Sequence, residues 1–249
     1  MKRKANAKTV ESYHHGNLRE SLLNAALKFL EKNPLEKLSL RTLAMKAGVS
    51  QAAPYRHFKD RNAVLAAISQ QGFELKFKYM LESFIQNRQN PRELIHGCAQ
   101  SYFKMGLLHP QHFKLMLTSP VCPSQEYPEL ESAAGLAFGL LKMVVEICQA
   151  AEVIGPGDPY HKSMHCWAMV NGFTTLYAEG RLEWLGVTDE NAKAALRIFV
   201  DQFLSGHQSA LKEKEGFKLF STEEASGSLE KLKQAEAAIQ QILQKNNSN

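Results

Sequence analysis

Polar and basic side chains are gathered between positions 39 and 61, in the stretch SLRTLAMKAGVSQAAPYRHFKDR. Amide, guanidinium, imidazole and hydroxyl groups in such a cluster can bond base edges and phosphates. Gln51 can bridge N6 and N7 of adenine, and Arg41 can either reach a guanine edge or pair with a phosphate. The predicted DNA contacts are Arg41, Thr42, Ser50, Gln51, Ala52, Ala53, Tyr55, Arg56, His57, Lys59 and Arg61.

The predicted contacts divide by what each side chain can reach. Ala52 and Ala53 are small enough to approach a thymine methyl group. Hydroxyls of Thr42 and Ser50 can bond the DNA backbone. The groups expected to hold phosphates, which fix the register without reading the sequence, are Tyr55, His57, Lys59 and Arg61. Phe58, in the middle of this set, is expected to pack in the core.

Two short helices joined by a tight turn would position these groups. The apolar stripe of the first helix consists of Leu40, Leu43 and Ala44 at helical spacing. Ser39 is suited to cap that helix, and Gly48 stands where the chain must leave it with a positive φ. Ser50 is expected to cap the second helix, in which Pro54 predicts a slight distortion rather than loss of the helix. The pattern predicts a helix-turn-helix whose second helix enters the major groove.

Charge is distributed unevenly along the chain. Residues 1–62 contain 13 Lys and Arg against 5 Asp and Glu, a net charge of +8, whereas residues 63–249 contain 17 against 20, a net charge of −3. A basic segment attached to a mildly acidic one suits a domain that meets phosphates. An ordinary solvated basic face would give the same balance, so the helix-turn-helix pattern is what favours DNA.

The remaining chain predicts an all-α fold, with no alternating strand pattern. A helix capped by Asn17 should run to about residue 32, and one capped by Asp60 to about residue 84. Further helices are expected over 91–108, 110–118, 127–152, 160–184 and 188–214. The predicted organisation is a flexible basic arm (1–13), a helix-turn-helix DNA-binding domain (14–62), a larger helical effector-binding and dimerisation domain (63–214) and a polar tail (215–249) with one amphipathic helix over 228–244.

Several other classes of protein are disfavoured. The basic N-terminus lacks the apolar run of a signal peptide, and Lys142 and Glu146 interrupt the longest apolar stretch, so no membrane span is expected. The four cysteines form no CxxC pair and are expected to be reduced, mostly buried thiols of a cytoplasmic protein. No GxSxG, HExxH or glycine-rich phosphate loop occurs, so we expect no enzyme, no catalytic residue and no cofactor.

Two histidines at helical spacing are the one cue for a metal. His161 and His165 lie four residues apart, a spacing that can chelate a metal from one helix face. No third convergent ligand is evident, so a surface or packing role is favoured and no metal site is predicted.

The stretch from about residue 13 to 68 resembles the tetracycline-repressor (TetR) family of bacterial transcription regulators. The resemblance rests on YHHGNLRESLLNAAL, SLRTLAMKAGVS and APYRHFKDRNAVL, and most specifically on Tyr55-x-His57-Phe58 followed by Lys59 and Asp60. A second stretch, CWAMVNGFTTLYAEGRL, resembles the Trp…His-Gly helix of a C-terminal subfamily, with Asn171 in place of the histidine. The resemblance implies a two-fold homodimer, a palindromic operator, and a pocket in the C-terminal helices whose small-molecule ligand releases the protein from DNA.

Aromatic, methionine and polar side chains of the second domain supply the candidate pocket for a hydrophobic effector. They are Phe103, Met105, His109, Phe113, Met116, Phe138, Trp167, Asn171, Thr174 and Tyr177. Taken singly, the apolar ones are better explained as ordinary core residues, and the polar ones at least as well explained as satisfied buried polar groups. The favoured function is a dimeric repressor in the bacterial cytoplasm that is nucleoid-associated when bound to DNA. The alternatives are an activator or partner-controlled regulator that uses the helix over 228–244, and a metal-binding protein with an accessory DNA-binding domain.

Overall fold

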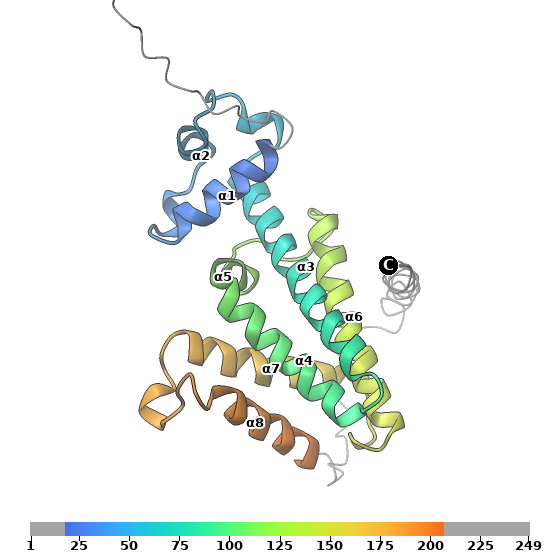
Figure 1. Ribbon diagram of the computed structural model, residues 1–249. Coiled ribbons are helices and arrows are strands. Elements are labelled where there is room, and N and C mark those ends of the chain that lie inside the picture. Colours follow the sequence, from blue (N-terminus) through green and yellow to red (C-terminus); the bar gives the residue numbers. More distant parts are fainter. Residues whose placement is uncertain (1–17, 207–249) are drawn as a thin grey trace, which may run out of the picture. The chain divides into compact units, whose positions relative to one another are not determined.

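The computed structural model describes residues 18–206, and within this range the chain is all-α (Figure 1). The predicted arm, the cap at Asn17 and the predicted helix over 228–244 lie outside the described residues. The chain divides into two compact units with the boundary between Val64 and Leu65. The predicted all-α fold class is therefore confirmed for the described part of the chain.

The first unit consists of short helices around a small apolar core. Its elements are α1 (Leu18–Leu30), the 3-10 helix η1 (Leu35–Lys37), α2 (Leu40–Ala47) and the 3-10 helix η2 (Pro54–Arg56). α2 contacts both α1 and η2. The buried side chains at these contacts include Leu22, Leu23 and Ala26 of α1 and Leu43 and Ala44 of α2.

The second unit is a bundle of longer helices. It contains most of α3 (Arg61–Asn87), followed by α4 (Pro91–Leu108), α5 (Pro110–Thr118), α6 (Pro128–Ala150), α7 (Pro159–Ala178), the 3-10 helix η3 (Glu183–Leu185) and α8 (Ala192–Gly206). α4 is its central helix, since it contacts α5, α6, α7 and α8. Apolar side chains of all these α-helices form one continuous core.

Local signals set where these helices begin and end. Each helix from α4 to α7 begins with a proline, which is tolerated at the first helical position because its missing N–H would have no partner there. The expected helix over 160–184 is wrong at its end, because α7 stops at Ala178. Gly180 adopts a left-handed φ of +67°, and the Arg181 N–H donates to the Leu176 carbonyl, which closes the helix early.

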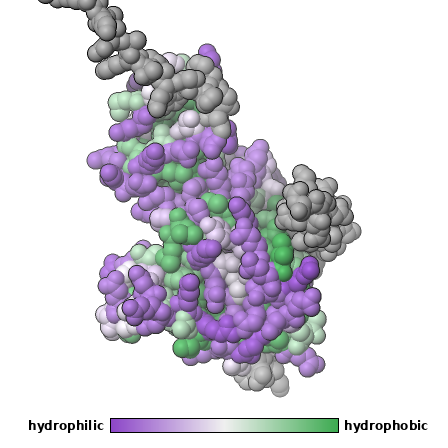
Figure 2. All heavy atoms as spheres, in the orientation of Figure 1, coloured by the Kyte–Doolittle hydropathy of each residue, from purple (hydrophilic) through white to green (hydrophobic). Residues whose placement is uncertain are grey.

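α6 is long and apolar enough to cross a membrane by length and composition alone. Its buried residues, including Leu140, Leu141 and Val144, instead belong to the core of the second unit. α6 packs on α4 and α7, and 44% of its most apolar window is buried there. The face in Figure 2 is largely hydrophilic, with smaller apolar patches.

Candidate DNA-binding surface and effector cavity

The first helix of the helix-turn-helix, α2, has the predicted ends. The Ser39 hydroxyl accepts a hydrogen bond from the Thr42 N–H (3.1 Å), which satisfies one of the free donors of the helix start. Gly48 adopts the left-handed conformation with φ +67°, and the following Val49 N–H donates to the Ala44 carbonyl. The predicted N-cap and the predicted glycine turn are both confirmed.

The second helix of the motif differs from the prediction. Between Gln51 and Phe58 the chain forms a turn and the three-residue η2 instead of a Ser50-capped α-helix, and no side chain caps η2. Pro54 has no N–H to donate to the Ser50 carbonyl, and that carbonyl accepts from Ala53 instead. The proline therefore shortens the recognition segment more than expected, and the predicted α-helix capped by Ser50 is wrong.

Two buried side chains anchor the recognition segment, which we define as residues 50–61. Pro54 is buried, and Phe58 is 3% exposed, which confirms the expected core role of Phe58. The guanidinium of Arg19 lies over the Phe58 ring, 5.4 Å from its centroid. With these two residues turned inward, the side chains between and beside them face solvent.

The predicted DNA contacts lie on the outside of this unit. Arg41, Ser50, Gln51, Ala52, Tyr55, Arg56, His57 and Lys59 are exposed, and Thr42, Ala53 and Arg61 are half-buried. The segment ends where the Asp60 carboxylate accepts a hydrogen bond from the Ala63 N–H (2.8 Å), the predicted cap of α3. This surface offers amide, guanidinium, ammonium and hydroxyl groups that are already exposed, so they could bond DNA without a rearrangement of the fold.

The second unit contains a small, partly open cavity between its long helices. Its volume is about 20 Å³, close to the space that one water molecule needs. The lining residues come from α3, α4, α6 and α7 and are Lys76, Met80, Cys98, Ala99, Tyr102, Leu141, Cys166, Trp167 and Val170. A drug-sized ligand needs at least about 300 Å³, so a ligand of that size can enter only if these helices move apart.

Lys76 is the one cationic group in this lining, and the sequence analysis missed it. Its side chain is 2% exposed, and burial lowers the pKa of its ammonium to about 8. Lys76 lies between Phe73 and Met80 on the apolar stripe of α3. A lysine inside an apolar stripe was the signal available in the sequence, but long lysine stems also occur on half-buried faces.

Of the predicted pocket residues, Trp167 lines this cavity. Asn171 does not line the cavity but is hydrogen-bonded to a residue that does. The Tyr102 hydroxyl donates to the Asn171 carbonyl oxygen (2.8 Å) and accepts a hydrogen bond from the Trp167 indole N–H (3.4 Å). Phe113 packs edge-on against Tyr102, with 5.6 Å between ring centroids, and Phe138 packs against Trp167. These side chains form a first layer around the cavity lining.

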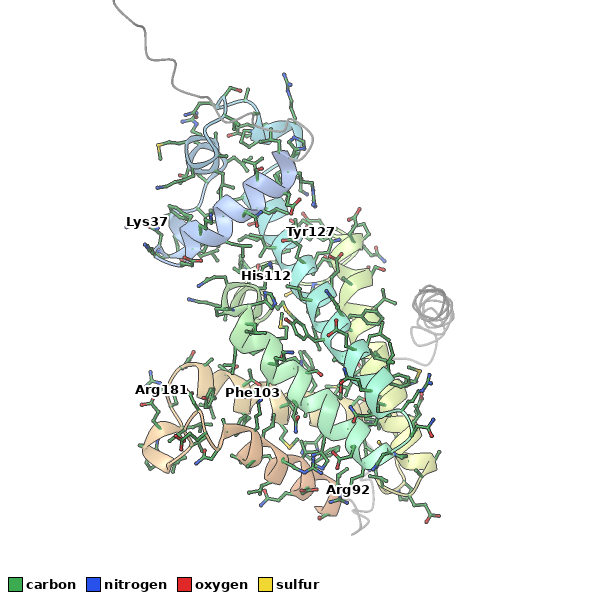
Figure 3. All side chains as sticks on the ribbon, in the orientation of Figure 1. Lys37, Arg92, Phe103, His112, Tyr127 and Arg181 are labelled. Atoms are coloured by element: carbon green, nitrogen blue, oxygen red, sulfur yellow. The ribbon has the colours of Figure 1, made fainter. Side chains whose placement is uncertain are left out.

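The other predicted pocket residues have neighbours of their own. Phe103, labelled in Figure 3, packs against Phe173 and Tyr177, and the Tyr177 hydroxyl donates to Asp189. The Thr174 hydroxyl donates to the Val170 carbonyl one turn earlier (2.7 Å). Of the remaining three, Met105 is fully buried in the core. The His109 ring packs against Tyr79, and the Met116 side chain lies beside Gly72.

The histidine pair considered for a metal has other contacts. His161 is exposed, and its Nδ1 lies 3.4 Å from the Asp158 carboxylate. His165 packs against the Phe203 ring, with 5.2 Å between centroids. Among residues 18–206, no group of three His, Cys, Asp or Glu side chains is placed to hold a metal ion.

Three of the four thiols are buried and one is exposed. Burial raises the pKa of Cys98 and of Cys148 to about 12, and it also raises the pKa of Cys166. These three thiols stay protonated near neutral pH and are weak nucleophiles. Cys122, between α5 and α6, is the exposed cysteine.

Comparison with solved structures identifies the fold of known regulators. A structure of a protein with unknown function from a Rhodococcus species is 33% identical, covers 80% of this chain and 100% of its own, and has a TM-score of 0.67. PfmR, a TetR family transcriptional regulator from Thermus thermophilus, is 18% identical over 79% of this chain and 98% of its own (TM-score 0.58). FadR from Bacillus subtilis, solved with stearoyl-CoA, is 13% identical over 76% of this chain and 98% of its own (TM-score 0.61). The last two likenesses show the fold alone.

Family models cover both units. Residues 22–68 match the bacterial regulatory proteins of the tetR family, and residues 95–203 match the tetracyclin repressor-like C-terminal domain. No curated protein matches the chain. With the helix-turn-helix geometry and the helical second unit, these matches show that the chain belongs to the TetR family of transcription regulators.

Proposed function

We propose that the protein is a homodimeric repressor that binds a palindromic operator and is released from it by a small hydrophobic effector. The observation that carries this proposal is the recognition segment, where Pro54 and Phe58 turn inward and Gln51, Arg56 and Lys59 face solvent. The proposed DNA contacts are those predicted from the sequence. The protein would act as a regulator in the bacterial cytoplasm and not as an enzyme.

Exposed apolar side chains on the second unit support the proposed homodimer. Trp184 of η3 is 81% exposed, and Leu185 beside it is exposed as well. Ile198 and Phe199 of α8 are also exposed, and the Phe199 ring contacts α7. Large apolar groups exposed on these consecutive elements fit an interface, and a second copy of the chain is the occupant that would give a two-fold reader of a palindrome.

Release by an effector would work as a population shift. Two recognition segments must match the spacing of successive major grooves, about 34–36 Å or a multiple of it. α3 supplies Arg61–Val64 to the first unit and its remaining residues to the second unit, whose cavity it also lines. A ligand that binds more tightly to the state with the wrong spacing, by a few kcal/mol, would draw the protein away from DNA.

The test is retention of DNA duplexes tiled across the region that flanks the gene, at several salt concentrations. We expect one protected palindrome and an affinity that falls steeply with salt. Weak binding to every duplex, without preference, would contradict the proposal for that region. A sedimentation measurement on the same sample should give a dimer.

Two variants separate sequence reading from phosphate binding. Gln51→Ala should weaken binding to the palindrome by about 1–3 kcal/mol and relax base preference at one position. Lys59→Ala should weaken all duplexes alike and reduce the salt slope by about 1. Lys32→Ala, the same loss of charge outside the recognition segment, is the matched control and should do neither.

A further inference from the structure

The ammonium of Lys76 is held inside the second unit by aromatic rings and has no anionic partner there. Its Nζ lies 5.1 Å from the ring centroid of Tyr102, 5.2 Å from that of Trp167 and 5.9 Å from that of Phe73. No carboxylate forms an ion pair with it in the described part of the chain. The rings come from three different helices, so the tertiary fold builds this cage around the cation.

Such an arrangement is costly unless a ligand completes it. A buried charge is normally paired, because removing it from water carries a large desolvation cost. Contacts with aromatic faces recover only part of that cost. Lys76 also faces the cavity, so a negative group that entered there would be its nearest counter-ion.

The remaining lining restricts what that negative group can be attached to. Met80, Ala99, Leu141 and Val170 offer hydrocarbon surface to the cavity. The Tyr102 hydroxyl already donates to Asn171 and accepts from Trp167, so it has little capacity left for a ligand. One cation in an apolar lining suits a singly charged anion, and a phosphate ester or a dicarboxylate would bring a second charge with no partner.

We infer that this cavity, opened by movement of its helices, binds an organic monocarboxylate with a hydrocarbon or aromatic body, and that Lys76 receives the carboxylate. This inference rests on the proposed function, in that it names the chemical class of the effector. The aromatic cage would then orient the carboxylate, and the body would lie along Met80, Leu141 and Val170. Entry of the body would push on α3, which continues into the first unit.

The first arm of the test measures binding without DNA. The chain has two tryptophans, and Trp184→Phe, which keeps an aromatic ring on the proposed dimer surface, leaves Trp167 as the only indole, in the lining of the cavity. The probes are decanoate, phenylacetate and biphenyl-4-carboxylate, each compared with its neutral primary amide, and the readout is the Trp167 fluorescence of the full chain. We expect at least one acid to give a saturable change and to bind more tightly than its amide.

Lys76→Met removes the cation while keeping an apolar side chain of similar length. In this variant the acid should bind weaker by a factor of roughly 30 or more, and the difference between acid and amide should vanish. Lys104→Met is the matched control, because Lys104 is exposed and lies over the ring of Tyr79, away from the cavity lining. Equal binding of acids and amides, binding by none of the acids, or unchanged affinity in Lys76→Met would overturn the inference.

The second arm adds an operator duplex and measures whether the acid releases it. A failure of release can be distinguished from a failure of the acid to bind. If the acid binds through Lys76 but leaves DNA retention unchanged, the ligand site stands and effector release is wrong. If no duplex is retained at all, the fluorescence arm still decides the inference. An acid that both binds through Lys76 and releases DNA from the wild type, but not from Lys76→Met, supports the two proposals together.

Discussion

Cationic side chains have opposite surroundings in the two units. In the first unit Arg41, Arg56 and Lys59 stand in solvent on a surface anchored by buried neighbours. In the second unit Lys76 lies in the core among aromatic rings. An exposed charge costs little stability and is accessible to a polyanion, whereas a buried charge lowers stability and gains most from one small anion. The comparison separates two kinds of proposed binding site that both rely on a cationic side chain.

The largest expected effect comes from removing an anchor of the exposed surface. Phe58→Ala should destabilise the first unit by about 3–5 kcal/mol, because a buried aromatic side chain would leave a cavity. Amide hydrogen exchange of α1 and α2 measures this. Tyr55→Ala, an exposed neighbour, should change that exchange by less than about 0.5 kcal/mol. Similar protection in both variants would mean that the surface does not depend on its anchor.

The next effect concerns the buried cation and has the opposite sign. A pKa of about 8 for Lys76 in the folded protein, against 10.5 when unfolded, corresponds to roughly 3 kcal/mol of lost stability at pH 7. Lys76→Met should therefore raise the free energy of unfolding of the second unit by up to about 3 kcal/mol in urea denaturation. A less stable variant would contradict the unpaired-charge description.

The same lysine should make stability depend on pH. Between pH 8 and 10.5 the unfolded chain keeps a proton on this lysine that the folded chain has lost, so the contribution of Lys76 to stability rises with pH. The titratable groups that face Lys76 are Cys98, Cys166 and Tyr102, and burial raises the pKa of each in the folded protein. They ionise earlier in the unfolded chain, so their contributions to stability fall as pH rises and oppose that of Lys76. The urea midpoint of the wild type should therefore rise relative to that of Lys76→Met across this window, and this difference isolates the lysine from the thiols and the phenol.

A smaller effect compares one glycine from each unit. Gly48→Ala should cost about 1–2 kcal/mol, because φ is +67° although nothing lies within 4 Å of the added carbon. Gly135→Ala adds the same methyl group in α6, also into open space, and should stabilise the protein by about 0.4–1 kcal/mol. Thermal unfolding of both variants measures the contrast, and shifts of the same sign would contradict it.

The smallest effect tests exposed charge within the second unit itself. The Arg197 guanidinium donates two hydrogen bonds to Glu93, which hold the pKa of that carboxyl below its ordinary value. Arg197→Gln should let the Glu93 pKa rise, but it should cost less than about 1 kcal/mol because both side chains are about 40% exposed. The stability from this pair is lost as pH falls through the folded pKa, and carboxyl NMR titration follows it.

The parts of the fold set by local chemistry could be predicted from the sequence. Ser39, Gly48 and Asp60 act at helix ends through bonds or dihedral angles that involve only near neighbours, and all three behave as expected. The effect of Pro54 was underestimated, because the balance between a distorted α-turn and a 3-10 turn depends on how the segment packs. For the same reason, the early end of α7 at Gly180 was missed.

The cavity could be predicted only in outline. An apolar lining in the second domain followed from its aromatic and methionine residues, and Trp167 was among those named. Which side chains meet inside a bundle depends on helix crossings that bring residues 76, 98, 141 and 166 together. Helical periodicity identifies a buried face, but it does not say which neighbouring helix covers each position. For this reason the sequence analysis did not identify Lys76 as a cavity residue, since it is a single polar residue within an apolar stripe.

The uneven burial of the thiols gives the protein a selective attachment point. A maleimide reagent should modify Cys122 and spare Cys98, Cys148 and Cys166, because these three are buried and protonated near neutral pH. In the proposed homodimer, a nitroxide at Cys122 would place one spin on each subunit. Pulsed electron paramagnetic resonance could then follow the separation of the two second units while ligand or operator is added, with no engineered cysteine.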